Sequence, residues 1–154
     1  MDDKLVIGSD GTGSKAGRFL TYAVVARGYV FTTASRGYDP ATFEASTESG
    51  TLPSDLATEA RFALERQHAV LKDAGGDLDT VVKVNIFVNT DDAHDLDTVN
   101  DLYDDFFTSH GIMRPPPRCV VNARFAVGRI AVDLIATTAD QQGSARGDAA
   151  DAGQ

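Results

Sequence analysis

The chain has a single cysteine, Cys119, among its 154 residues, so it cannot form an internal disulfide bond. One cysteine also leaves a structural zinc site without a second thiolate ligand. No stretch reaches the roughly 20 consecutive apolar residues that a membrane-spanning helix needs. These absences predict a soluble protein of the reducing cytoplasm with no membrane partner.

Basic residues are also scarce. The 14 lysines and arginines are outnumbered by 23 aspartates and glutamates, and the net charge is -9. Such a chain repels phosphate backbones and has no basic run, so nucleic-acid binding is disfavoured unless an oligomer gathers scattered arginines into one channel. The first residues, MDDKLVIGSDGTG, carry acids where a secretory signal has basic residues, so export by that route is not expected.

The glycine-rich start of the chain does not form a phosphate loop. A phosphate loop needs the order Gly-Lys-Ser/Thr, whereas residues 13–15 read Gly-Ser-Lys, and strand formers follow instead of a helix. We therefore expect residues 1–16 to be a flexible segment and residues 17–138 to be one domain. Residues 139–154 lack apolar periodicity and predict a disordered tail.

The domain begins with a predicted β-hairpin. Residues 22–26 and 29–33 are rich in strand formers, and an Arg-Gly pair between them supplies a short turn. A helix is then predicted to begin with Ser54 as its N-cap and to end at the Gly-Gly pair of residues 75–76.

A central strand and a second helix follow. The segment VVKVNIFV at 81–88 predicts a strand in the middle of the sheet, because both of its faces are mostly apolar. Apolar residues between 96 and 107 recur at helical spacing and stop at Gly111. After a proline run that excludes helix, strands are predicted at 119–123 and 130–137.

The order ββαβαββ predicts an α/β (α+β) fold. A crossover between strands implies a mixed β-sheet with both helices packed on one face. The other face would then expose apolar side chains, and copies of the same chain could cover it. The pattern therefore already favours an oligomer.

Several segments, taken together over about residues 17–137, resemble the RidA/YjgF family: GYVFTTASRGYDP, EARFALERQHAVLKDAGGDLDTVVKVNIFV, DLDTVNDLYDDFF, CVVNARF and IAVDLIA. The resemblance implies a chorismate-mutase-like fold and a homotrimer with small-molecule pockets between subunits. It also implies hydrolysis of reactive enamines and imines, a reaction that needs no metal or cofactor because an imine carbon is already electrophilic.

The resemblance implies four pocket positions. Phe19 stands at the family's aromatic position near the start, and Thr33 stands at the serine of its Ser-Gly pair. Asn100 keeps the helix asparagine, and Cys119 keeps the cysteine of the closing hairpin.

Two positions depart from the family pattern. The substrate-carboxylate arginine is replaced by Pro117, and Arg118 follows one residue later. A shift of one residue turns a strand side chain to the opposite face unless a bulge restores its direction. The glutamate that positions water aligns with Ala131, and the nearest carboxylate, Asp133, lies on the same strand face about 7 Å away.

The candidate catalytic residues are thus Arg118, Cys119 and Asn100, and the candidate substrate-binding residues are Phe19, Thr33 and Asp133. Simpler interpretations stay open for some of these residues. Cys119 can serve as a small apolar residue, and Asn100 can make only a surface hydrogen bond.

Other polar residues invite structural interpretations. The three histidines lack metal-ligand spacing and are expected on the surface. The aspartates between 91 and 97 are expected to cap the second helix rather than to bind calcium. Arg36 and Arg114 could approach an anionic ligand, but solvent exposure is the simpler expectation.

The leading hypothesis is an enzyme that acts on an imine, enamine or related carbonyl-derived metabolite. The displaced arginine and missing glutamate favour a specialised biosynthetic relative over a general imine deaminase. The alternative is a non-catalytic trimer that binds a small metabolite or a protein. Ribonuclease activity, also attached to the family, fits an acidic chain poorly.

Overall fold

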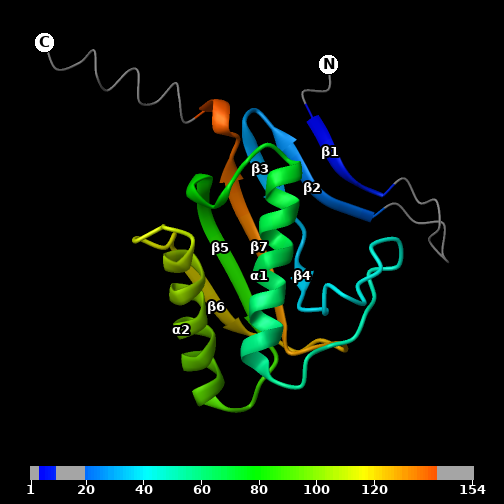
Figure 1. Ribbon diagram of the computed structural model, residues 1–154, viewed down its shortest axis with the longest axis vertical. Coiled ribbons are helices and arrows are strands. Elements are labelled where there is room, and N and C mark those ends of the chain that lie inside the picture. Colours follow the sequence, from blue (N-terminus) through cyan, green and yellow to red (C-terminus); the bar gives the residue numbers. More distant parts are fainter. Residues whose placement is uncertain (1–3, 10–19, 142–154) are drawn as a thin grey trace, which may run out of the picture.

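The computed structural model describes residues 4–9 and 20–141, which form one mixed β-sheet and two long helices (Figure 1). The elements in chain order are β1 (Lys4–Ser9), β2 (Leu20–Ala26), β3 (Tyr29–Thr32), β4 (Ser35–Arg36), α1 (Leu56–Asp73), the 3-10 helix η1 (Leu78–Thr80), β5 (Val81–Val88), α2 (Ala93–Ser109), β6 (Arg118–Asn122) and β7 (Ile130–Thr137).

The sheet has the strand order β1-β2-β3-β7-β5-β6, and the short β4 pairs with β7 beyond the end of β3. All neighbouring strands are antiparallel except β5 and β6, which are parallel. The predicted mixed sheet is therefore confirmed. Strand β5 is an interior strand, as expected, but it lies next to the edge strand β6, and β7 is closer to the middle.

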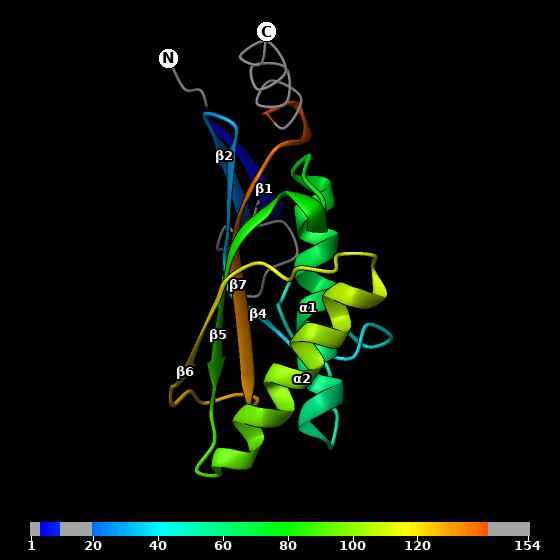
Figure 2. The same cartoon turned by 90° about the vertical axis from the view of Figure 1, so that its left-hand side faces the viewer.

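Both helices pack on the same face of the sheet, as Figure 2 shows in edge view. The side chains that fill this interface alternate along the strands, because successive residues of a strand point to opposite faces. In β7, for example, Val132 and Leu134 are buried in the core with Val84 and Ile86 of β5. The opposite face carries no helix, and we call it the open face.

The predicted turn between β2 and β3 is confirmed. Arg27 and Gly28 both have positive φ, at 51° and 77°, which is the backbone of a two-residue hairpin turn that matches the sheet's twist. Glycine adopts such angles without strain, so the second turn position suits it.

Helix α1 begins one residue later than predicted. The N-cap is Asp55 rather than Ser54, and its Oδ1 accepts a hydrogen bond from the backbone N–H of Thr58 at 2.8 Å. Both residue types cap helices well, so composition alone could not choose between them. The helix ends before Gly75, whose φ of 85° suits a residue beyond a helix end, as predicted.

Part of the expected flexible segment is a strand. Lys4–Ser9 forms β1, which pairs with β2 along its length, because a run of apolar β-formers here meets an otherwise open sheet edge. The start of the expected tail is also ordered by the fold, since the N–H of Ala139 bonds to the carbonyl of Gly75 at 3.0 Å. Phe19 and residues 142–154 lie outside the described residues.

Within the described part of the chain, neither helix combines the length and the apolar composition that a membrane crossing requires.

Candidate active site

The open face carries a polar row across three adjacent strands. Asn85 of β5 is in register with Asp133 of β7 on one side and with Cys119 of β6 on the other. Directly opposed residues share a face, and the residues flanking Asp133 and Asn85 in β7 and β5 are buried toward the helices. Asp133, Asn85 and Cys119 therefore lie side by side on the open face.

A hydrogen bond fixes one end of the row. The Nδ2 of Asn85 donates to Oδ1 of Asp133 at 2.8 Å, and both side chains are half-buried. The other carboxylate oxygen, Oδ2, has no protein partner within the described residues. Asp133 can therefore accept a further hydrogen bond from water or from a ligand on the open face.

The thiol of Cys119 occupies the other end of the row. Cys119 is exposed, and no hydrogen bond reaches it from the described residues. Because neighbouring strands lie about 4.8 Å apart, the thiol and the carboxylate of Asp133 are separated by roughly 10 Å. A ligand of a few heavy atoms could touch both groups, but the two groups do not touch each other.

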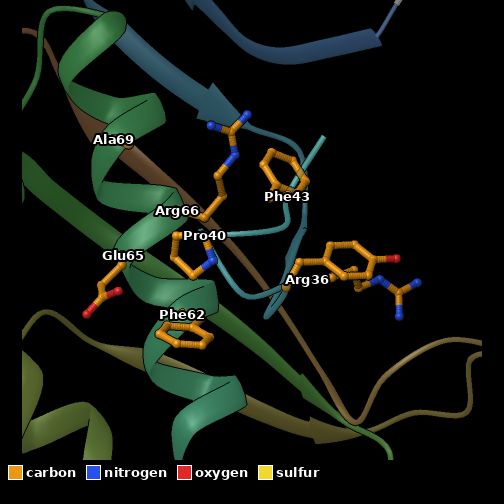
Figure 3. A pocket seen from close by; sticks show the side chains of 8 residues that line it. Arg36, Pro40, Phe43, Phe62, Glu65, Arg66 and Ala69 are labelled. Carbon is orange, nitrogen blue, oxygen red and sulfur yellow. The ribbon is translucent and has the colours of Figure 1, made fainter. Parts of the chain in front are cut away.

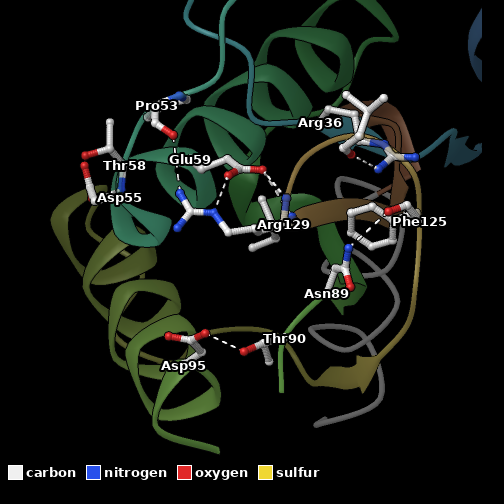
Figure 4. Close-up of polar contacts among 12 residues, drawn as sticks. Arg36, Pro53, Asp55, Thr58, Glu59, Asn89, Thr90, Asp95, Phe125 and Arg129 are labelled. Atoms are coloured by element: carbon white, nitrogen blue, oxygen red, sulfur yellow. Dashed lines mark hydrogen bonds and ion pairs between the residues drawn. The ribbon is translucent and has the colours of Figure 1, made fainter. Parts of the chain in front are cut away.

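Arg36 lies two residues along β7 from this row. Its Cα is opposite Ala131 in the β4–β7 pair, so Arg36 faces the open side, while its neighbour Ser35 is buried against α1. The Nη1 of Arg36 donates to the carbonyl of Val127 at 2.5 Å, and its guanidinium lies 4.3 Å from the ring centre of Phe125 (Figure 4). The arginine thus stands beside Ala131 of β7.

Thr33 lies at the break between β3 and β4, opposite the middle of β7. Its N–H bonds to the carbonyl of Tyr22 at 2.9 Å, and its own carbonyl accepts from Nε2 of Gln67 at 2.9 Å. Gln67 is buried in α1 and also donates to Oγ of Ser35 at 2.8 Å. This glutamine therefore holds the break in place from the helix side of the sheet.

Arg118 and Asn100 meet on the opposite side of the sheet from Cys119. The Nε of Arg118 donates to Oδ1 of Asn100 at 2.7 Å, and Nη1 forms an ion pair with Asp104 at 3.0 Å. The guanidinium also lies 4.7 Å from the ring centre of Tyr103. Strand β6 pairs with β5 without a register shift, so no bulge turns Arg118 toward the open face.

The six predicted site residues therefore separate into groups. Cys119 and Asp133 share the open face with Thr33 nearby, Arg118 and Asn100 form a pair beneath α2, and Phe19 lies outside the described residues. Sequence reasoning missed Asn85, which lies between Asp133 and Cys119 in the row and bonds to Asp133. A lone polar amide within the apolar run VVKVNIFV was the available signal.

A buried acid anchors the start of β7 to α1. Glu59 is 1% exposed and its Oε1 accepts from the backbone N–H groups of Arg129 at 2.6 Å and Ile130 at 3.2 Å (Figure 4). Its Oε2 accepts from Nε of Arg129 at 3.1 Å. The preceding Gly128 has φ 77°, and a Cβ there would come within 2.7 Å of Oε1, so this glycine is needed for the close approach.

Three aspartates near the start of α2 have protein partners, and one of them caps the helix. Asp92 is the N-cap and accepts from the N–H of His94 at 2.9 Å, Thr90 donates to Asp95, and Asp91 pairs with Arg124. Among residues 4–9 and 20–141, no three histidine, cysteine or acidic side chains converge as metal ligands would.

The comparisons with known proteins agree with this fold. The 2-iminobutanoate/2-iminopropanoate deaminase of Escherichia coli K12 is 38% identical over 77 residues, which are 50% of this chain and only 59% of that relative. The crystal structure of E. coli TdcF with bound serine superposes with a TM-score of 0.65 at 26% identity, covering 78% of this chain and 88% of TdcF. The structure of the YjgF gene product from E. coli gives a TM-score of 0.66 at 25% identity, covering 86% and 98%.

The family comparison covers most of the chain. The sequence model described as endoribonuclease L-PSP matches residues 14–139, which include every described strand and helix except β1. The chain therefore belongs to the endoribonuclease L-PSP family, also known as RidA/YjgF.

Proposed function

We propose that this protein is a cofactor-independent enzyme that acts on a reactive imine, enamine or related carbonyl-derived metabolite at the open face of its sheet. The observation that carries the proposal is the carboxylate of Asp133, which Asn85 holds at 2.8 Å in the same register row as Cys119. The deaminase named among the relatives acts on imines, which supports the same substrate chemistry here.

The proposed reaction uses one water per imine. Oδ2 of Asp133 accepts a proton from water while the water oxygen bonds to the imine carbon, and the resulting carboxylic acid gives that proton to the nitrogen, so that a neutral carbinolamine forms. Oδ2 then takes the hydroxyl proton of the carbinolamine and passes it to the nitrogen, and as the C–N bond breaks, ammonia and a carbonyl compound leave. Asn85 keeps the carboxylate aimed through Oδ1, so Oδ2 stays available for the water.

The substrate is proposed to lack the small carboxylate of a 2-imino acid. Arg118, the candidate to bind such a carboxylate, is engaged by Asn100 and Asp104 on the helix side. This placement supports a specialised biosynthetic relative that promotes hydrolysis, condensation or cyclisation. Arg36 does face the open side, but it stands beside Ala131 rather than in the row of Asp133.

The working form is proposed to be a homotrimer in the cytoplasm, with the site completed between subunits. The open face supports this assembly, because Phe31 is 47% exposed and Val121 is 43% exposed there. Apolar side chains at this exposure favour contact with another protein surface. The expected light-scattering mass is three times the 16.3 kDa of one chain.

A second candidate function is a non-catalytic trimer that binds a small metabolite. One observation favours it: the row holds a single carboxylate, and the thiol of Cys119 has no base beside it among the described residues. A binding module would need the shape of the pocket but no proton acceptor.

The deciding experiment measures ammonia release from freshly generated imines by the wild type, Asp133→Asn and Asp101→Asn. Asp101 is an exposed acid of α2 on the helix side, so its variant is a matched control for charge. We expect acceleration by the wild type and by Asp101→Asn, and at least a tenfold lower rate for Asp133→Asn. Acceleration by none of the proteins would favour the binding module.

A further inference from the structure

A cavity of about 340 Å³ lies between α1 and the loop that follows β4 (Figure 3). Its lining residues come from the end of β4, the loop and α1: Arg36, Tyr38, Pro40, Phe43, Phe62, Glu65, Arg66 and Ala69. We call it the α1–loop pocket. It uses none of the residues in the Asp133 row, and a volume of this size suits a small organic ligand, since such sites start at about 300 Å³.

The walls of the α1–loop pocket are mainly aromatic. The rings of Tyr38 and Phe43 stack with centroids 5.9 Å apart and planes inclined by 22°. Phe62 of α1 and Pro40 of the loop supply the remaining flat apolar surfaces (Figure 3). These surfaces favour a planar apolar body over a flexible polar one.

Arg66 places one cation at this apolar pocket. Its guanidinium lies 4.8 Å from the ring centre of Phe43 and 4.9 Å from that of Tyr22, so the two rings hold it in position. Arg66 forms no ion pair within the described part of the chain, although the protein's net charge is -9. Burial raises the pKa of the Tyr22 phenol, and the nearby charge of Glu48 raises it further. Glu48 forms no ion pair with Arg66 among the described residues.

The other charged lining residues are turned elsewhere. Glu65 pairs with Arg61 at 3.3 Å, and Figure 3 shows its carboxylate pointing away from the pocket. The guanidinium of Arg36 lies on Phe125, also directed away. The α1–loop pocket therefore combines a flat apolar interior with the guanidinium of Arg66, which forms no ion pair with a carboxylate of the described residues.

We propose that the α1–loop pocket binds a small aromatic monocarboxylate. The ring of the ligand would lie against Phe62 and Phe43, and its carboxylate would take the free N–H donors of Arg66. A guanidinium presents paired N–H donors that match the two oxygens of a carboxylate. The phenol oxygen of Tyr22 cannot accept from all five N–H groups of Arg66, so donors remain for a ligand. This site is distinct from the open-face site and goes beyond the proposed enzyme function.

The test is a titration of the full-length protein with benzoate, followed by isothermal calorimetry and by amide chemical shifts. Saturable binding is expected with a Kd on the order of 1 mM or lower, and the largest shifts are expected at Phe43, Phe62 and Ala69. Benzamide, which has the same ring and no charge, should bind at least tenfold more weakly.

Two arginine variants separate a direct contact from a general charge effect. Arg66→Gln should weaken benzoate binding at least tenfold, whereas Arg114→Gln removes the same charge from the exposed connection between α2 and β6, outside the pocket, and should leave the affinity unchanged. No saturation of the wild type at millimolar benzoate would overturn the proposal. Chemical-shift changes of the wild type centred on Asn85 and Asp133 would overturn it as well. This readout uses the wild type alone, so it holds even if a variant fails to fold.

Discussion

The Nε of Arg118 donates to Oδ1 of Asn100 at 2.7 Å, and this bond holds the arginine beneath α2. The next residue along β6, Cys119, faces the open side of the sheet. Arg118 and Cys119 would share one pocket only if a bulge turned the arginine. Without a bulge, they lie on opposite faces of the strand. We infer that Arg118 joins α2 to the sheet edge instead of binding substrate.

This role predicts a stability effect for Arg118→Ala. The variant leaves Asn100 and Asp104 without their charged donor, so the free energy of unfolding should fall by about 1 to 2 kcal/mol. Urea denaturation of Arg118→Ala, Asn100→Ala and the double variant measures the coupling. Arg124→Ala is the control, because its ion pair with Asp91 is highly exposed and should contribute less than about 0.5 kcal/mol.

Removal of the Glu59 carboxylate should lower the free energy of unfolding more than removal of the Arg118 or Arg124 guanidinium. Glu59→Ala strands two backbone N–H groups and the guanidinium of Arg129, and the expected loss is about 3 kcal/mol. Glu59→Gln keeps one acceptor and should lose less. Glu65→Ala, which removes an exposed acid from the same helix, should stay within about 0.5 kcal/mol in the same denaturation experiment.

Tyr103 should make stability fall at alkaline pH. Burial raises the pKa of its phenol well above the ordinary value of 10.0, and the hydroxyl donates to the carbonyl of Pro116 at 2.7 Å. The unfolded chain then releases this proton near pH 10 while the folded chain keeps it. The free energy of unfolding therefore falls as the pH rises above 10.

Tyr103→Phe removes that titration. The variant should be about 1 kcal/mol less stable at pH 7, because Pro116 loses its hydrogen-bond donor. Its stability should then decline less than that of the wild type between pH 10 and pH 11.5, measured by urea midpoints. Parallel declines of the two proteins would contradict the effect of burial on this phenol.

The proposed trimer can be tested at the open face. Val121→Asp places a charge among apolar side chains that a neighbouring subunit would cover, so the light-scattering mass should drop toward that of one chain. Met113→Asp is a matched control, because Met113 is 78% exposed in the connection between α2 and β6. If Val121→Asp keeps the wild-type mass, this face is not the subunit interface.

Much of the fold was predictable because its signals are local. The apolar faces of residues 81–88 predicted β5, helical spacing predicted α1 and α2, and the Arg-Gly turn predicted the hairpin. Strand β1 was missed, because whether a short apolar run pairs depends on an open sheet edge that only the folded sheet provides.

The site was less predictable because its contacts join distant parts of the chain. Asn85 and Asp133 are 48 residues apart, and Glu59 and Arg129 are 70 apart, so their pairing depends on the strand register and on helix placement. Register reasoning did identify the two possible directions of Arg118. The absence of a bulge in β6 selects the direction toward α2.

The most direct test of the central claim compares two imine classes in one hydrolysis assay with freshly generated substrates. One class, such as 2-aminoacrylate and its imino form, carries a carboxylate next to the reacting carbon, and the other lacks it. We predict acceleration of carboxylate-free imines that depends on Asp133 and is unchanged in Arg118→Ala. Strong acceleration of 2-aminoacrylate that collapses in Arg118→Ala would contradict the account, because it would place Arg118 in the reaction site.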